Sequence, residues 1–156
     1  MKFRFTVSMV VLTVILLIAA CRKKVETPPL KAPGEIVWLT NLDTAKVIAG
    51  RLNKPLMIDF MAEWCPPCQE MEKTTFNQPA VIAKAGEFVT VRIDVDKQGD
   101  VANAYNCNAN KYGGVGIPNM LFMDFEDYRL RHVIGYREPE KLLSVMDSVL
   151  TEFAAR

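Results

Sequence analysis

The sequence predicts an α/β fold, and three observations support this prediction. The chain has 156 residues, which allows one domain with short appendages. Apolar runs of strand length alternate along it with segments whose apolar residues recur at helical spacing. Two cysteines separated by two residues, Cys65 and Cys68, stand where one such run gives way to a helical segment. Half of the residues are apolar, enough for one ordinary core.

Five short segments have the composition of strands. A first strand is expected at 36–39. Residues 56–61 form a nearly continuous apolar run, as is typical of a buried central strand. Residues 88–95 are rich in β-branched side chains and alternate in polarity. Residues 120–123 and 130–134 flank an acidic turn and are expected to form a hairpin.

Five further segments are predicted to be helical. The first follows a cap at Asn41 or Asp43 and ends near Leu52, shortly before a proline. The last covers about 139–153 and carries one apolar face. The three helices between them are expected at 69–74, 80–84 and 101–108.

Cys65 and Cys68 form a CxxC motif at the start of a predicted helix. A helix N-terminus presents unpaired N–H groups and a positive dipole end, and both favour a thiolate over a thiol. The thiolate is the nucleophile in disulfide exchange, so the motif predicts a dithiol that cycles with a disulfide. The alternatives are a static disulfide and half of a metal site. Zinc needs two more ligands, and the remaining candidates stand at no recognisable ligand spacing: Cys21, Cys107 and His132.

Two motifs carry a resemblance to a known family. Residues 59–68, Asp-Phe-Met-Ala-Glu-Trp-Cys-Pro-Pro-Cys, resemble the active-site segment of thioredoxins. Residues 111–118, Lys-Tyr-Gly-Gly-Val-Gly-Ile-Pro, resemble the later segment that carries the cis-proline of that family. Two motifs in the right order are far more specific than a lone CxxC. Residues 72–81 also resemble the C-terminal thioredoxin-like domain of the DsbD transmembrane thiol reductases, and the likeness extends from about Ile36 to about Leu150.

The resemblance implies a thioredoxin fold, a central mixed β-sheet flanked by helices, that works without a cofactor or a metal. Cys65, nearest the loop surface, is expected to attack a substrate disulfide, and Cys68 to resolve the mixed disulfide. Asp59 is an anomaly in its apolar run, because a buried carboxylate is unfavourable unless it is hydrogen-bonded or protonated. It matches the buried acid that exchanges protons with the second cysteine. The alternative is an Asp that faces solvent or binds nearby backbone.

Trp64, Ile117 and Pro118 are the expected substrate-binding residues. The resemblance implies that the Ile117–Pro118 bond is cis, and because cis peptides are essentially confined to X-Pro bonds, this position has to be a proline. Ile117 is then expected to offer its backbone groups to the partner chain. Trp64 is expected to shield one side of the dithiol, with ordinary packing as the alternative. Asn119 replaces the usual threonine, which bears on substrate preference and not on the fold.

Arg92 and Cys107 each have two interpretations, and His132 has a structural one. Arg92 stands roughly where thioredoxins often carry a lysine near the buried acid, so it either biases the charge on Asp59 or faces solvent. Cys107 is interpreted as a partly buried small residue, with an exposed thiol that forms mixed disulfides as the alternative. His132, in the last predicted strand, is expected to be structural and far from the dithiol.

The first twenty residues are interpreted as an export signal. Two basic residues precede an apolar stretch, 7–20, that is short for a membrane span of about 20 residues. Ile18-Ala19-Ala20-Cys21 resembles the lipobox of bacterial lipoproteins, in which Cys21 is lipidated and becomes the new N-terminus. Ile18 is too large for an ordinary signal-peptidase site, so simple secretion is the second interpretation after a lipoprotein. An uncleaved anchor is the third interpretation.

The expected organisation is a lipoprotein signal peptide at 1–20, a lipidated cysteine and flexible tether at 21–34, and a thioredoxin-like domain at 35–156. The alternative interpretation of the tether segment is a disordered tail without a spacing role. Such a protein is anchored to a bacterial membrane in the cell envelope, with its domain facing the periplasm or the exterior, where disulfides form readily. The net charge of +1 gives no indication of nucleic-acid binding, and we expect a monomer.

Pro66 and Pro67 predict the direction of electron flow. Neither has an N–H group, so within the loop only Cys68 and residues beyond it can donate to the Cys65 thiolate. Fewer donors leave the pKa of Cys65 less depressed, which makes the pair more reducing. The chain is therefore predicted to reduce protein disulfides with electrons from a membrane thiol transporter. The alternatives are an oxidase or isomerase on the same fold and, from another class, an envelope copper-binding or copper-delivery protein.

Overall fold

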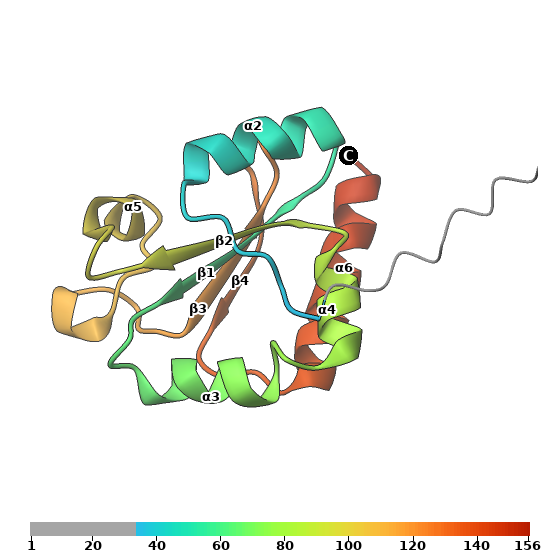
Figure 1. Ribbon diagram of the computed structural model, residues 1–156. Helices are drawn as coiled ribbons and strands as arrows, with labels where there is room; N and C mark the ends of the chain where they lie inside the picture. The colour runs from blue at the N-terminus through green and yellow to red at the C-terminus, as the bar shows by residue number, and fades with distance from the viewer. Residues whose placement is uncertain (1–33) are drawn as a thin grey trace, which may run out of the picture. The chain divides into compact units, whose positions relative to one another are not determined.

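A computed structural model describes residues 34–156 of the chain (Figure 1). The predicted signal peptide, the expected lipid attachment at Cys21 and most of the tether fall on residues outside this range. Within it, no helix is both long enough and apolar enough to cross a membrane.

One mixed sheet forms the centre of the described domain, and the prediction of such a sheet is confirmed. Its strands are β1 (Leu56–Met61), β2 (Val89–Asp94), β3 (Asn119–Met123) and β4 (Arg129–Ile134). They lie in the order β2-β1-β3-β4. β1 is parallel to β2 and antiparallel to β3, and β3 and β4 form the predicted antiparallel hairpin.

Helices cover both faces of this sheet (Figure 1). They are α2 (Leu42–Leu52), α3 (Pro66–Thr74), α4 (Pro79–Ala85), α5 (Gly99–Ala104), α6 (Pro139–Ala154) and the short 3₁₀ turn η1 (Asn110–Tyr112). α2 and α5 pack against one face, together with Leu56, Ile58 and Phe60 of β1. α3, α4 and α6 contribute to a second cluster on the other face, together with Met57. Because β1 is covered on both sides, its sequence shows no polar alternation.

The helix starts follow from capping residues. The Asn41 side chain accepts a hydrogen bond of 2.8 Å from the Thr44 N–H, so Asn41 and not Asp43 caps α2. α3, α4 and α6 each begin with a proline at the first helical position, where the missing N–H has no intrahelical partner to lose. The helix predicted from residue 69 therefore begins three residues earlier, at Pro66.

Two predicted elements are wrong in extent. Residues 36–39 do not form a strand, because only Leu39 pairs with β2, in an isolated bridge to Val91. The Val37 carbonyl accepts instead from the Thr90 hydroxyl, a side-chain bond in place of a ladder bond. The helix predicted at 101–108 is the shorter α5, which ends before Asn106 adopts a left-handed conformation with φ of 55°.

The loop between α5 and β3 folds back on itself through backbone hydrogen bonds. The Gly114 N–H donates to the Ala109 carbonyl, and the Gly116 N–H donates to the Asn108 carbonyl at 3.0 Å. A Cβ atom on Gly114 would overlap the Asn108 carbonyl oxygen, so the backbone approach requires glycine there. The loop thus places residues 114–118 at a fixed position directly before β3.

Replacing Gly114 by alanine is expected to lower the free energy of unfolding by about 1–3 kcal/mol, because the added methyl group forces the loop backbone apart. Gly99→Ala is the matched control: a Cβ there meets no atom within 4 Å, so its effect should stay within about 0.5 kcal/mol. Urea denaturation of both variants measures the difference. Equal stabilities would contradict this account of the loop.

Candidate active site

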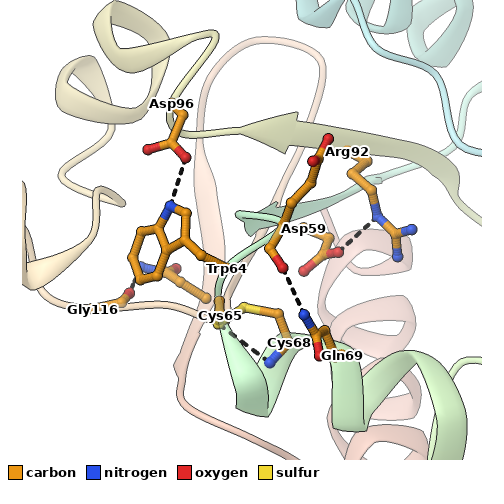
Figure 2. The surroundings of a disulfide bond; sticks show 10 residues. Asp59, Trp64, Cys65, Cys68, Gln69, Arg92, Asp96 and Gly116 are labelled. Atoms are coloured by element: carbon orange, nitrogen blue, oxygen red, sulfur yellow. Dashed lines mark hydrogen bonds and ion pairs between the residues drawn. A yellow bond between two sulfur atoms is a disulfide. The ribbon is translucent and has the colours of Figure 1, made fainter.

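Cys65 and Cys68 form a disulfide at the N-terminus of α3 (Figure 2). Cys65 is the N-cap residue, and its sulfur accepts a hydrogen bond of 3.2 Å from the Cys68 N–H. Pro66 and Pro67 occupy the two positions between them, so the donor pattern expected from two prolines is present. The motif therefore lies where the sequence predicted it, at the junction of β1 and a helix.

The two cysteines do not differ in exposure as the sequence suggested. Cys65 is 2% exposed and Cys68 is 6% exposed. The expectation that Cys65 lies nearer the surface is wrong for this disulfide form, because both residues pack into the core cluster on the α2 and α5 side of the sheet. What distinguishes Cys65 is its place at the helix cap.

Asp59 lies in β1 and is almost completely buried, with 2% exposure. Its partner in the register is Arg92 of β2, and the Arg92 Nε–H donates to Asp59 Oδ2 at 3.0 Å. Among the described residues, Asp59 Oδ1 has no hydrogen-bond partner. Burial raises the pKa of Asp59 to about 6, although the Arg92 charge opposes the increase. In the view of Figure 2, the Asp59 carboxyl lies between the disulfide and Arg92.

Arg92 is held in place by more than Asp59, so its solvent-facing interpretation is wrong. Its guanidinium carbon lies 4.3 Å from the centre of the Trp38 ring. It also donates to Glu72 Oε2 at 2.6 Å. Neither neighbour of Arg92 was expected from the sequence. Glu72 could have been found, because it stands four residues after Cys68 on the same face of α3, whereas Trp38 comes from a distant segment.

The Ile117–Pro118 peptide bond is cis, as predicted. Ile117 and Trp64 line a shallow pocket of about 330 Å³, together with Gly116 and Ile134. Pro118 itself is buried and does not line this pocket. Figure 2 shows Trp64 and Gly116 beside the disulfide. The structure therefore brings the predicted residues Trp64 and Ile117 to one surface.

Trp64 is held at the surface by specific contacts and is 44% exposed. Its indole N–H donates to Asp96 Oδ2 at 2.6 Å, and the Lys111 ammonium lies 3.7 Å from its ring centre. Tyr112 also donates to Asp96, and these two hydrogen bonds contribute to lowering the pKa of Asp96. Ordinary packing, the alternative interpretation of Trp64, does not describe this arrangement.

Cys107 and His132 contact each other through their side chains. Cys107 is completely buried, and burial raises the pKa of its thiol to about 11, so the exposed-thiol alternative is wrong. His132 Nε2 lies 3.5 Å from the Cys107 sulfur and 2.6 Å from Asn119 Oδ1. Residues 34–156 contain no group of three or more His, Cys, Asp or Glu side chains placed to hold a metal ion.

A family profile described as Thioredoxin-like matches residues 37–124, more than half of the chain. The chain belongs to this thioredoxin-like family. With a CxxC pair that forms a disulfide, it is a thiol–disulfide oxidoreductase of that family.

Its relatives include DsbD proteins, which are thiol:disulfide interchange proteins. The DsbD protein of Haemophilus ducreyi is 32% identical over 108 residues, which cover 69% of this chain and 18% of that protein. The DsbD protein of Vibrio vulnificus is 46% identical over 50 residues, covering 32% of this chain and 8% of that protein. The chain thus spans less than a fifth of the length of these relatives.

Solved structures support the same fold. A thioredoxin from Thermus thermophilus aligns with a TM-score of 0.65 at 21% identity, covering 78% of this chain and 92% of that one. The C-terminal domain of DsbD from Neisseria meningitidis, in its oxidised form, aligns with a TM-score of 0.56 at 21% identity, covering 71% and 97%. The predicted thioredoxin fold and the resemblance to a DsbD-type domain are confirmed.

Asp59 is expected to make stability depend on pH. Its pKa is about 6 in the folded chain, above the ordinary value of 3.8 for an aspartate, so the folded state binds this proton more tightly. That contribution is complete below about pH 4 and is lost as the pH rises through about 6. Relative to Asp59→Asn, the wild-type chain should lose on the order of 3 kcal/mol of unfolding free energy between pH 4 and pH 7.

Urea denaturation across this pH range measures the effect. Asp43→Asn, which changes an exposed carboxyl, is the matched control and should reproduce the wild-type pH dependence. A difference between wild type and Asp59→Asn that stays constant with pH would show that Asp59 does not titrate in this window.

Proposed function

We propose that this protein is a membrane-tethered reductant of protein disulfides in the cell envelope. Its DsbD relatives are thiol:disulfide interchange proteins, which supports protein thiols and disulfides as its substrates. The observation that carries the proposed direction is the cap of α3. There the Cys65 sulfur accepts from Cys68 alone within the loop, because prolines occupy both intervening positions. A thiolate with few donors is poorly stabilised, and this favours the disulfide form of the pair.

The exchange proceeds through two sulfur transfers. The Cys65 thiolate attacks one sulfur of the substrate disulfide, forms a mixed disulfide and releases the other substrate sulfur as a thiolate. Cys68 loses its proton and attacks the Cys65 sulfur, which releases the second substrate thiolate. The substrate gains two electrons, and the Cys65–Cys68 disulfide forms. A membrane thiol-electron donor then reduces this pair again.

Residues around the Cys65–Cys68 pair supply a general base and the substrate-binding contacts in this proposal. Asp59, with a pKa of about 6, accepts the Cys68 proton near neutral pH, since a general base is most effective when its pKa lies near the working pH. Trp64 and Ile117 bind the substrate chain along the pocket that they line, and Pro118 follows directly in the chain. The Ile117 backbone groups pair with the substrate backbone next to the attacked sulfur.

The reduction potential of the Cys65–Cys68 pair, equilibrated against glutathione or dithiothreitol, tests the direction. A value near about −270 mV is expected for a reductant of the thioredoxin type. A value near about −120 mV would identify an oxidant and would overturn the argument from the two prolines.

Pro67→Ala tests the cause of that potential. It adds an N–H group at the second position of α3, where a donor can reach the Cys65 sulfur at the cap. The potential should become less negative by about 30 mV, which corresponds to a tenfold change in the equilibrium constant. Pro66→Ala is the matched control, because the first helical N–H does not usually bond to the cap side chain. Equal shifts in both variants would exclude the donor as the cause.

The proposed tether depends on a lipid attached to Cys21. In a bacterial host, wild-type protein should be recovered with the membranes, and Cys21→Ala should be released from them. Cys107→Ala, which removes a buried thiol, is the control and should stay with the membranes. Retention of Cys21→Ala in the membrane would favour an uncleaved anchor over a lipoprotein.

A further inference from the structure

Asn119 links the cis-proline segment to the edge of the sheet. It is fully buried and directly follows Pro118. Its amide Nδ2 donates to the Gly116 carbonyl at 3.3 Å, and its Oδ1 lies 2.6 Å from His132 Nε2 of β4. One side chain thus joins the residue before Ile117 to a histidine on the neighbouring strand.

The Gly116 carbonyl determines which groups donate and which accept in the contacts among Gly116, Asn119 and His132. The Gly116 carbonyl only accepts, so the Asn119 atom that faces it is the amide nitrogen, and Oδ1 faces His132. An amide oxygen also only accepts, so His132 Nε2 carries a proton and donates it to Asn119. The Cys107 thiol, 3.5 Å from the same nitrogen, therefore has the Tyr105 carbonyl at 3.4 Å as its acceptor.

This arrangement excludes a nucleophilic Cys–His pair. The histidine nitrogen that faces Cys107 is already committed as a donor to Asn119, so it cannot accept the thiol proton. The sulfur is also completely buried. His132 therefore donates its hydrogen bond to Asn119, and Cys107 packs against the His132 ring.

We propose that His132, acting through Asn119, positions the Gly116–Ile117 backbone for docking of the substrate polypeptide. This proposal rests on the proposed function, since it concerns how a protein disulfide reaches Cys65.

The backbone on either side of Ile117 is held by hydrogen bonds. The Gly116 N–H donates to the Asn108 carbonyl at 3.0 Å, and its carbonyl accepts from Asn119. The Pro118 carbonyl accepts from the Gly135 N–H at 2.8 Å. Ile117 itself makes no hydrogen bond to another residue of the described domain, so its N–H and carbonyl remain available to a partner chain.

The contact from His132 is what keeps the Asn119 amide in this orientation. Without a donor at that position, the buried Oδ1 loses its partner, and the amide gains by rotating toward another group. Such a rotation withdraws Nδ2 from the Gly116 carbonyl and frees the Gly116–Ile117 peptide to turn. The dithiol does not depend on this contact, since the Cys65 cap is made within α3.

The test compares His132→Leu, which removes the donor, with His132→Gln, whose amide can again donate to Asn119. The full chain reduces insulin disulfides with dithiothreitol as the electron source. Separately, pre-reduced chain freed of dithiothreitol reduces the small disulfide 5,5′-dithiobis(2-nitrobenzoate) in a single turnover, because dithiothreitol would reduce that disulfide directly. His132→Leu should raise the KM for insulin about 5–10-fold with little change in kcat. Its rate with the small disulfide and its reduction potential should stay at wild-type values, and His132→Gln should restore the KM.

Asn119→Thr provides a second variant that removes the Gly116 contact directly, and it decides the question if His132→Leu does not fold. An unchanged KM for insulin in His132→Leu, or in Asn119→Thr if His132→Leu does not fold, overturns the proposal, as does an equal loss of rate with both disulfides.

The amide resonances of Gly116 and Ile117 separate this inference from the proposed function. They should shift in His132→Leu and return in His132→Gln, and unchanged resonances would overturn the positioning role. Wild-type protein that does not reduce insulin would overturn the proposed function and the docking role with it. The resonances would then still show whether His132 sets the backbone.

Discussion

The burial of β1 on both faces is the constraint on which the rest of the structure depends. A strand covered by α2 and α5 on one side and by the second core cluster on the other has no exposed position for a polar residue. Asp59 therefore has to be accommodated inside, and its carboxyl group retains its proton to a higher pH. The same strand runs directly into the loop that carries Cys65, so one rigid element sets the positions of both the acid and the disulfide.

Arg92 connects this buried acid to the outside of the domain. It contacts Asp59 at one end and Glu72 at the other, while Trp38 covers its guanidinium plane. Arginine suits this position because its planar fork can serve two carboxylates and stack on an aromatic ring at once. A cation that is shared with Glu72 stabilises the Asp59 anion less than a dedicated partner would, and this agrees with a pKa that stays raised beside a positive charge.

Much of the fold and the centre of the site could be predicted from the sequence because their signals are local. The apolar run of β1, the CxxC at its end and the cis Ile117–Pro118 bond each lie within a few consecutive residues. The strand expected at 36–39 is absent because the Thr90 hydroxyl, a side-chain donor on β2, bonds to the Val37 carbonyl in place of a backbone ladder bond. The contact between His132 and Asn119 depends on the register of β3 and β4, and no pattern within either strand indicates it.

Cys107 shows how a domain can carry a third sulfur in the same core cluster as a reactive pair without side reactions. Thiol–disulfide exchange needs a deprotonated sulfur that can approach a disulfide in line, and the enclosed Cys107 thiol meets neither condition. Disulfide scrambling inside the described domain, in which Cys107 would displace one of the paired cysteines, is therefore blocked kinetically. The folded domain keeps a single pairing even though its cysteine number is odd.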